Sequence, residues 1–411
     1  MEDTQILRIK HYEEILRTVE GLLSAEETAE EDLAGLRGGI RELEAYYGSP
    51  EWKQDFADDE AGRLPGDLAR GVLSEDGIYN VLESFRERTE GSGRRSGMKR
   101  IAVDIGGTSL RTAVFDEEMK ILDVFKVPND RTLGAAGNLD KLVGFLKSRD
   151  YAYCGVGIAS PGPLDLKRGM ILNPPNLFGW DNFPVADFLA ERMGVPAAVN
   201  NDGNLAGLAE ARIGAGKGFD SVVFLGMSTG MGGSFVYKGE LINGAHCNTA
   251  EFYNVIVSDD PYHHGSANPG SLNELAGGAA MERIATERFG RQMFAKDLFA
   301  LYDEGNEDAA DILEKTSEML ARGIANIYYM IDPDVYVIGG SIGLHNRWYV
   351  AKALEKAKRY MVMPDINVAW SVFGDDAGLY GAALLAGDAA GLKGILRKIR
   401  NRDCRENRYQ I

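Results

Sequence analysis

Cysteine and histidine are both rare in this chain of 411 residues, which contains three Cys and five His. Cys154, Cys247 and Cys404 lie far apart in the sequence, so we expect no disulfide framework and a reducing compartment. No apolar run approaches the roughly 18 residues that a membrane helix needs. The first residues also lack the basic start and apolar core of a secretion signal. These absences predict a cytoplasmic protein that does not span a membrane.

Positive charge is also in short supply, because 45 Lys and Arg stand against 62 Asp and Glu and leave a net charge of −17. Nucleic-acid binding needs clustered basic side chains for phosphate contacts, so we do not expect a nucleic-acid partner. Basic residues are dense only in the C-terminal tail, residues 391–411, between Lys393 and Arg408. This tail is typical of a solvated helix end, with contact to a membrane or a nucleic acid as the alternative.

Residues 1–97 are more acidic than the rest of the chain, with 23 acidic and 12 basic side chains. Their apolar residues recur at helical spacing and predict an antiparallel helical hairpin: Tyr12, Ile15, Leu16, Val19, Leu22, Leu23, Leu33, Leu36, Ile40, Leu43 and Tyr47. The acidic segment 55–60 lacks the pattern of a calcium loop, so we expect a solvated surface loop there. A third helix is predicted from Ser74 to about Arg88. Residues 91–97 are rich in Gly, Ser and Arg and predict a flexible linker after a helical domain at residues 1–90.

Two segments after the linker combine a strand, a glycine-rich turn and a second strand. The first strand ends near Asp104 and is followed by Gly106, Gly107 and Thr108. In the second segment, the first strand begins at Ser221 and leads into the glycine-rich turn 226–233. Glycines in such turns let backbone N–H groups approach an anion closely, although a plain hairpin turn has the same composition. Two such hairpins, each opening an α/β half, predict a duplicated fold with a nucleotide between the halves.

Two further polar segments follow apolar strands. Gly339, Gly340 and Ser341 end the strand near residues 335–338, where a flat base or ribose could lie against the backbone. The pair Asn201 and Asp202 stands between an apolar strand and a predicted helix. A carboxylate at this position can serve in catalysis, or it can simply cap the helix.

In their order along the chain, these motifs resemble the ROK family of sugar kinases and sugar-responsive repressors. The resemblance covers about residues 98–388 and is carried by seven motifs: Asp104-Ile-Gly-Gly-Thr108, Ser160-Pro-Gly-Pro163, Asn176-Leu-Phe-Gly-Trp180, Asn201-Asp202-Gly-Asn204, Thr229-Gly-Met-Gly-Gly233, Ala250-Glu251 and Gly339-Gly340-Ser341. It implies an α/β, actin-like ATPase (ribonuclease H-like) fold with two lobes, preceded by the small all-α domain. Residues 1–90 resemble a small bacterial domain family of unknown function.

The resemblance also implies where the lobes lie. The smaller lobe would span residues 98–207 and regain a segment at about 375–390, and the larger lobe would span residues 208–374. The cleft between the lobes is expected to close on the sugar. The helical region from Leu313 to Tyr329 offers an apolar face for the expected homodimer, or it packs into the core of the larger lobe.

The family's functional residues carry over to matching positions in this sequence, with ATP and Mg²⁺ as the implied cofactors. Asp202 would be the general base that accepts the proton of the sugar hydroxyl, and Asp104 would hold Mg²⁺ through water. The implied sugar-binding residues are Gly162, Asn201, Asp202, Glu251, Asn254 and Asn273. The implied phosphate- and nucleotide-binding residues are Gly106, Gly107, Thr108, Thr229, Gly230, Gly232, Gly233, Gly339, Gly340 and Ser341.

The sequence departs from the family in the segment that follows Glu251. Many members bind zinc there with a His and a cysteine-rich run, but residues 262–271 contain no Cys, so we expect no structural zinc. His246, Cys247, His263 and His264 remain as donors, although their spacing matches no usual zinc pattern. Asn254 stands where the family has a sugar-binding His. Asn273 stands where it has a Glu, with Glu274 next to it. Such changes alter which sugar fits.

Two functions follow from these patterns. The first is ATP-dependent phosphorylation of a hexose or hexoside at the 6-hydroxyl, as in glucokinases and β-glucoside kinases. The second is a non-catalytic sugar-binding regulator of the same family. Both phosphate turns are intact, and the leading domain is acidic and hairpin-like where the repressors have a winged helix-turn-helix. These two features favour the kinase.

Overall fold

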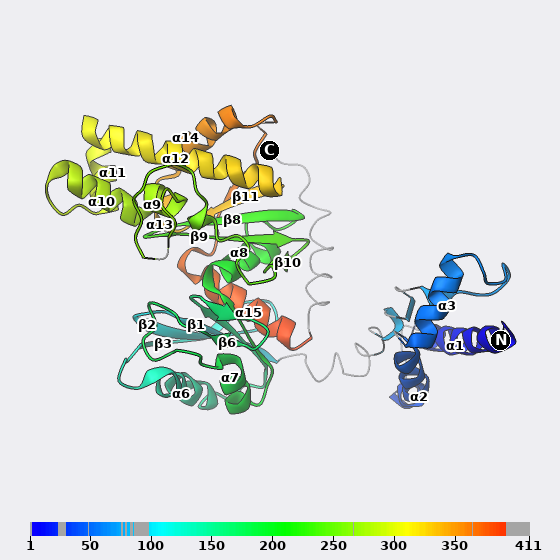
Figure 1. Ribbon diagram of the computed structural model, residues 1–411. Helices are drawn as coiled ribbons and strands as arrows, with labels where there is room; N and C mark the ends of the chain where they lie inside the picture. Colours follow the sequence, from blue (N-terminus) through cyan, green and yellow to red (C-terminus); the bar gives the residue numbers. More distant parts are fainter. Residues whose placement is uncertain are drawn as a thin grey trace. The chain divides into compact units, whose positions relative to one another are not determined.

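A computed structural model of the chain describes residues 2–23, 30–47, 49–74, 98–265, 267–363 and 365–391, together with residues 77, 78, 80–82 and 85. The chain divides into two compact units, Met1–Gly97 and Met98–Ile411, which are drawn in Figure 1. The predicted linker 91–97 and nearly all of the basic tail lie outside the described residues. No helix in the described residues combines the length and apolar character that a membrane crossing requires.

The first unit is helical, as its apolar spacing predicts. Its elements are α1 (Glu2–Leu23), α2 (Glu30–Tyr46), α3 (Pro50–Glu60) and the short 3-10 helix η1 (Gly71–Leu73). Helices α1 and α2 pack together and bury Leu16, Ile40 and Leu43 in one apolar core, which confirms the predicted hairpin. The predicted helix at 74–88 falls mostly outside the described residues, and its described positions 77, 78, 80–82 and 85 are helical.

The prediction of a solvated acidic loop at residues 55–60 is wrong, because these residues form the second half of helix α3. The helix starts where Ser49 accepts a hydrogen bond from the Trp52 N–H and Pro50 occupies the first turn. Asp55 is completely buried. It accepts hydrogen bonds from the guanidinium of Arg8, at 2.6 and 2.9 Å, and from the Tyr46 hydroxyl, at 2.7 Å. Its charge is therefore neutralised by partners that lie far away in the sequence.

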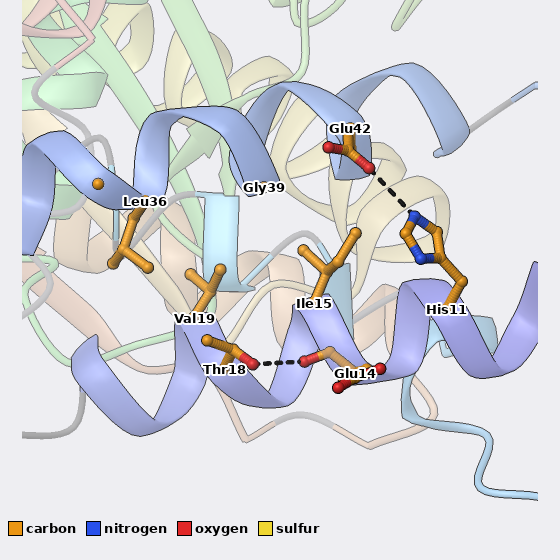
Figure 2. A pocket seen from close by; sticks show the side chains of 9 residues that line it. His11, Glu14, Ile15, Thr18, Val19, Leu36, Gly39 and Glu42 are labelled. Atoms are coloured by element: carbon orange, nitrogen blue, oxygen red, sulfur yellow. Dashed lines mark hydrogen bonds and ion pairs between the residues drawn. The ribbon is translucent and has the colours of Figure 1, made fainter.

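A shallow groove runs between α1 and α2, with a volume of about 350 Å³. Figure 2 shows Ile15 and Val19 of α1 facing Leu36 of α2 along its floor. Gly39 allows the two helices to approach closely, because a Cβ atom there would lie 2.9 Å from a methyl group of Ile15. At one end His11 and Glu42 join the helices through a contact of 3.1 Å between Nε2 and Oε2.

The second unit contains two five-stranded sheets that repeat one plan. The first has the order β3-β2-β1-β4-β7. Its strands are β1 (Lys99–Ile105), β2 (Ser109–Phe115), β3 (Ile121–Pro128), β4 (Tyr153–Ser160) and β7 (Ala197–Asn201). Strands β1, β4 and β7 run parallel, while the β1–β2 hairpin is antiparallel and surrounds the first glycine turn. Strand β4 is buried along almost its whole length, as expected for a central parallel strand.

The second sheet has the order β10-β9-β8-β11-β12. Its strands are β8 (Ser221–Met227), β9 (Met231–Tyr237), β10 (Glu240–Leu241), β11 (Val335–Gly339) and β12 (Val368–Trp370). The antiparallel β8–β9 hairpin surrounds the second glycine turn, and β11 pairs with β8 in parallel. Both sheets therefore consist of a hairpin followed by parallel strands, which is the duplication that the sequence predicts. Strands β5 (Leu164–Asp165) and β6 (Met170–Ile171) form a separate two-stranded sheet.

Helices cover the outer faces of the sheets and fill the space between them. Helices α6 (Gly134–Lys147) and α7 (Val185–Met193) pack on one face of the first sheet, below it in Figure 1. Helix α8 (Asp202–Ile213) packs against β8 and β9 of the second sheet, and α15 (Ala377–Ala389) packs against β1 and β4 of the first. The two helices also contact each other. Chain segment 377–389 thus returns to the first sheet, as expected, while the exact lobe boundaries stay a prediction.

The remaining helices cover the far face of the second sheet. They are η2 (Phe252–Asn254), α9 (Leu272–Ala276), α10 (Gly278–Phe289), α11 (Ala295–Asp303), α12 (Glu307–Ile331), α13 (Ser341–His345), α14 (Arg347–Ala357) and η3 (Lys358–Tyr360). The short η4 (Gly374–Asp376) instead leads into α15. Leu313, Leu320 and Ile324 of α12 are buried in the core. Most of the apolar face at residues 313–329 is therefore core, which was one of the two alternatives, while Tyr329 is exposed. The homodimer stays a prediction.

Candidate active site

Three strand ends of the first sheet place polar residues in one row. In the parallel register Asp104 of β1 lies opposite Ala159 of β4, and Ala159 lies opposite Asn200 of β7. Because the carboxyl ends of parallel strands meet at one edge of a sheet, Asp104 and Asn201 come from neighbouring strand ends. Gly162 follows two residues after Ser160, which pairs with Asn201. The structure thus gathers three of the predicted site residues along this edge.

Asn201, and not Asp202, caps helix α8. The Asn201 Oδ1 accepts hydrogen bonds from the N–H groups of Gly203 and Asn204, at 2.9 and 3.3 Å. Asp202 is the first residue of the helix and is exposed to solvent. The N-cap is therefore Asn201, although the Asp202 carboxylate also accepts the Gly203 N–H. The predicted sugar ligand Asn201 has already committed its carbonyl oxygen to the helix.

The environment of Asp202 disfavours its charge. The protein packed around this exposed carboxylate displaces much of its hydration and raises the pKa, and the charge of Asp104 raises it further. A hydrogen bond from the Gly203 N–H, at 2.8 Å, acts in the opposite direction. The pKa of Glu251 is also raised, first by burial and then by the charge of Asp202. Asp202 consequently lies within electrostatic range of both Asp104 and Glu251.

Arg111 is a residue that the sequence-based prediction missed. Its Nε and Nη2 atoms bind Asp104 Oδ2 at 3.0 and 2.9 Å, and its Nη1 binds Asp376 Oδ1 at 2.9 Å. The same guanidinium donates to the Asp375 carbonyl. Arg111 thus orients the predicted metal ligand and ties it to the start of α15. The available signal was its place opposite Asp104 across the β1–β2 hairpin. Its partner Asp376, far away in the chain, was not visible in the sequence.

The first glycine turn presents exposed backbone beside this edge. Gly107 and Thr108 are both exposed, while the Gly106 N–H donates to the Ser109 carbonyl at 2.9 Å and closes the turn. A Cβ atom on Gly107 would lie 3.0 Å from the carbonyl oxygen of Asn176. The segment 176–180 therefore packs against the turn, and the close contact favours glycine there.

The second glycine turn lies next to the start of α8. A Cβ atom on Gly203 would lie 3.5 Å from the carbonyl oxygen of Gly233 on β9. Gly203, the residue after Asp202, therefore lies close to β9. Within the turn, the Ser228 N–H donates to the Gly230 carbonyl at 2.9 Å. In the described part of the chain, the N–H groups of Thr229 and Gly230 have no hydrogen-bond acceptor. Two free donors at such a turn can bind an anion.

The third glycine segment sits beside the second turn. Gly339 pairs with Gly226, so Gly340 and Ser341 follow directly after the end of β11 next to β8. Gly340 has a φ of 76°, and a Cβ atom on it would approach the backbone of Met227 to 2.3 Å. Only glycine fits there. The close approach brings the predicted nucleotide segment against the end of β8, which leads into the turn with Thr229 and Gly230. Gly232 opposes Gly226 across the hairpin.

Asn254 and Asn273, the two departures from the family, use their side chains within the protein. The Asn254 Oδ1 accepts a hydrogen bond from the Asn268 N–H at 2.6 Å. The Asn273 Oδ1 accepts from the Met231 N–H at 3.0 Å, and its Nδ2 donates to Glu274 Oε1 at 3.0 Å. Both polar groups of Asn273 are thereby occupied, which the sequence did not indicate.

The donors considered for zinc do not assemble into a metal centre in the described residues, where no group of three or more His, Cys, Asp or Glu side chains is suited to hold a metal ion. His263 and His264 are exposed, and the Nδ1 of His263 lies 3.5 Å from the Pro261 carbonyl. The absence of structural zinc stays a prediction.

Comparison with known proteins identifies both parts of the chain. The model of the ROK family matches residues 100–389. The chain belongs to the ROK family. A domain family of unknown function, DUF4298, matches residues 9–91, which confirms the two predicted resemblances.

The curated relatives are sugar kinases. A glucokinase of Thermotoga maritima is 31% identical over 317 residues, which cover 72% of this chain and 99% of the relative. An N-acetylmannosamine kinase of Salmonella arizonae is 30% identical, over 70% of this chain and 98% of the relative. These matches confirm the prediction of an ATP-dependent sugar kinase.

Solved structures of ROK proteins share the fold of the second unit. A ROK hexokinase from Thermus thermophilus is 32% identical, with a TM-score of 0.65 over 70% of this chain and 98% of its own. A ROK glucokinase from Streptomyces griseus, solved with glucose and AMPPNP, is 29% identical, with a TM-score of 0.59 over 71% of this chain and 99% of its own. They confirm the predicted two-sheet, actin-like ATPase fold.

Proposed function

We propose that this ROK-family sugar kinase transfers the γ-phosphoryl group of ATP to the 6-hydroxyl of a hexose or hexoside. The observation that carries the proposal is the position of Asp202. Its carboxylate is exposed at the start of α8, where Asn201 is the N-cap and Asp202 accepts the Gly203 N–H. It lies in the electrostatic range of Asp104 and Glu251. Glucokinases among the relatives support a hexose.

In the proposed reaction Asp202 acts as the general base. Its carboxylate accepts the proton of the sugar hydroxyl while the hydroxyl oxygen bonds to the γ-phosphorus and the bond to the leaving ADP breaks. The raised pKa makes Asp202 a stronger proton acceptor than an ordinary exposed aspartate. Gly162, the Nδ2 of Asn201, and Glu251 are the proposed sugar contacts, because they lie along the same edge or couple to Asp202.

The chain's own residues also fit a bound nucleotide. The free N–H groups of Thr229 and Gly230 are proposed to bind phosphate, together with the turn at Gly106, Gly107 and Thr108. We propose that the nucleotide site is also lined by Gly232, Gly233, Gly339, Gly340 and Ser341. Mg²⁺ neutralises phosphate charge when bound. We propose that Asp104 would hold Mg²⁺ through water. Arg111 orients the Asp104 carboxylate by donating to its Oδ2 atom.

The identity of the sugar is a separate part of the proposal. The relatives include glucokinases and N-acetylmannosamine kinases, so the assay should cover hexoses, amino sugars and β-glucosides. A non-catalytic regulator is the second candidate, because ROK proteins include a transcriptional regulator of the same fold. The retained glycine turns and Asp202 favour the kinase. A cytoplasmic homodimer that binds neither membranes nor nucleic acid stays a prediction.

The test is turnover by the wild-type protein and by Asp202→Asn in an ATP-coupled assay over this sugar panel. Removal of a general base typically lowers turnover by about 10²–10⁴-fold, so we expect at least the lower figure. Melting temperature should change little, because the cap of α8 comes from Asn201.

Sugar affinity and ATP affinity, measured by calorimetry on the same preparation, serve as the control and should change far less than turnover. Near-native turnover of Asp202→Asn on the best sugar would refute the base assignment. Sugar binding without turnover by the wild-type protein, on every sugar tested, would favour the regulator.

A further inference from the structure

The second glycine turn is held in place by the first residues of α10. The backbone N–H groups of Gly278 and Ala279 donate to the carbonyls of Ser228 and Thr229, at 3.0 and 2.8 Å. A Cβ atom on Gly278 would approach the Ser228 carbonyl oxygen to 2.4 Å. The carbonyl side of the turn is therefore fixed against the start of α10.

Asn273 fixes the other end of the same turn. Its Oδ1 accepts the Met231 N–H at 3.0 Å, and its Nδ2 donates to Oε1 of the buried Glu274 at 3.0 Å. The Gly277 N–H also donates to the Asn273 carbonyl at 3.0 Å. A Cβ atom on Gly230 would lie 3.2 Å from Asn273 Oδ1, so the amide packs directly under the turn.

These contacts leave a specific pair of donors available. The carbonyls of Ser228 and Thr229 and the N–H of Met231 are used within the protein. The N–H groups of Thr229 and Gly230 are the donors of this turn that lack an acceptor in the described residues. A hydrogen-bonded frame around two free N–H groups reduces the conformational freedom that anion binding would otherwise have to remove.

We propose that Asn273 is a positioning residue for the nucleotide-phosphate turn, acting through the Met231 N–H, and is not a ligand of the sugar. The inference rests on the proposed kinase function and replaces the sugar-binding role that the family resemblance implied for Asn273. A carboxylate at position 273 would place negative charge beside Glu274 and below a phosphate-binding turn. The neutral amide avoids both repulsions, and its N–H group donates a hydrogen bond to Glu274.

The test compares Asn273→Ala with Asn254→Ala in the full-length protein. Asn254 is the matched control because its side-chain oxygen accepts the Asn268 N–H and, among the described residues, makes no hydrogen bond with the turn. We measure the Kd of Mg·ATP by calorimetry, and the KM values for ATP and for the best sugar. Loss of one supporting hydrogen bond predicts a roughly three- to tenfold weaker ATP affinity for Asn273→Ala. The KM for sugar should change less than twofold, and Asn254→Ala should keep the wild-type affinity for ATP.

Hydrogen exchange in the wild-type protein gives a second measurement that does not depend on a variant's folding. Mg·ATP should slow amide exchange at Thr229 and Gly230, while the Met231 amide should already be protected without nucleotide. Unchanged ATP affinity in Asn273→Ala, a selective rise in its KM for sugar, or rapid exchange at Met231 would each overturn the inference. Failure of the wild-type protein to bind ATP would instead refute the proposed function, so the two failures are distinguishable.

Discussion

At the scale of single residues, the neighbouring Asn201 and Asp202 divide two tasks between them. Asn201 satisfies the first N–H groups of α8, and this leaves the Asp202 carboxylate to face solvent at the helix start. The surrounding protein and the charge of Asp104 then raise the Asp202 pKa. An aspartate with a raised pKa holds a proton more tightly, which is the property that a base needs when it deprotonates a sugar hydroxyl.

The raised pKa predicts a pH dependence of catalysis. The base works only when it is deprotonated, so activity should be lost as the pH falls through the Asp202 pKa. Because that pKa is raised in the folded protein, the acid limb of kcat/KM should lie above the ordinary aspartate value of about 3.9. The pH dependence of kcat/KM measures this limb.

Circular dichroism at each pH serves as the control, since it separates titration of the site from acid unfolding. An acid limb centred at or below about pH 3.9, with the fold intact, would contradict the assignment of the limb to Asp202.

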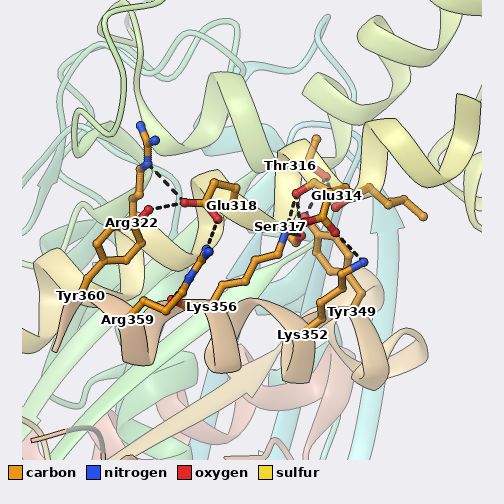
Figure 3. Close-up of polar contacts among 11 residues, drawn as sticks. Glu314, Thr316, Ser317, Glu318, Arg322, Tyr349, Lys352, Lys356, Arg359 and Tyr360 are labelled. Atoms are coloured by element: carbon orange, nitrogen blue, oxygen red, sulfur yellow. Dashed lines mark hydrogen bonds and ion pairs between the residues drawn. The ribbon is translucent and has the colours of Figure 1, made fainter.

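At the scale of elements, polar side chains join the outer faces of α12 and α14. Figure 3 shows Lys352 and Lys356 of α14 pointing toward Glu314 of α12. Lys356 is the most enclosed of these cations, with 11% of its side chain exposed. Its Nζ donates to the Glu314 carbonyl and to the buried Ser317 hydroxyl, each at 2.7 Å. Nearby, Glu318 binds Arg359 and the Tyr360 hydroxyl.

This arrangement predicts that Lys356→Met lowers the free energy of unfolding. Methionine keeps the apolar stem but leaves the Glu314 carbonyl and Ser317 hydroxyl without the charged donor. Hydrogen bonds to charged groups contribute about 1.5–3 kcal/mol each, so we expect a loss of about 1–3 kcal/mol after allowance for partial exposure. Urea unfolding monitored by circular dichroism measures this loss.

Lys358→Met is the matched control. The Lys358 side chain is 40% exposed, and its Nζ pairs at 2.5 Å with Glu355, which is 70% exposed. Exposed pairs contribute about 0–1 kcal/mol. Equal losses in the two variants would show that the contacts of Lys356 with α12 add no stability.

At the scale of the whole molecule, the chain joins two units with separate cores. The first unit has its own apolar cluster around Ile9, Leu43 and Val72, and its buried Asp55 is neutralised within the unit by Arg8. The three clusters of the second unit draw on residues after Met98. Every proposed catalytic and nucleotide residue also lies after Met98.

The separate cores predict that a truncated protein beginning at Met98 folds and keeps its kinase activity. We expect kcat/KM for the best sugar to stay within about tenfold of the full-length value, which corresponds to 1.4 kcal/mol in the barrier. Steady-state kinetics on the two proteins measures the ratio. Circular dichroism and melting temperature establish whether the truncated protein is folded. A larger loss in a folded protein would mean that residues 1–97 help to form the site.

The sequence by itself determined the parts of this protein that depend on neighbours along the chain. Apolar spacing predicted the α1–α2 hairpin, and strand–glycine–strand patterns predicted both sheets' hairpins, because local geometry follows from nearby residues. The motif from Asn201 to Asn204 likewise located the start of α8. Residues 55–60 show the limit, since an acidic run has the same pattern in a loop and in a helix such as α3.

Only the tertiary structure decided which distant groups meet. Arg111 binds Asp376, 265 positions away, Asn273 binds the Met231 N–H, 42 positions away, and Arg8 binds Asp55, 47 positions away. Such contacts form when packed elements bring side chains within about 3 Å, and no local spacing encodes that distance. For this reason the family resemblance implied a sugar ligand at Asn273, whereas the packing of α9 against the β8–β9 turn places its amide under the backbone that we propose binds phosphate.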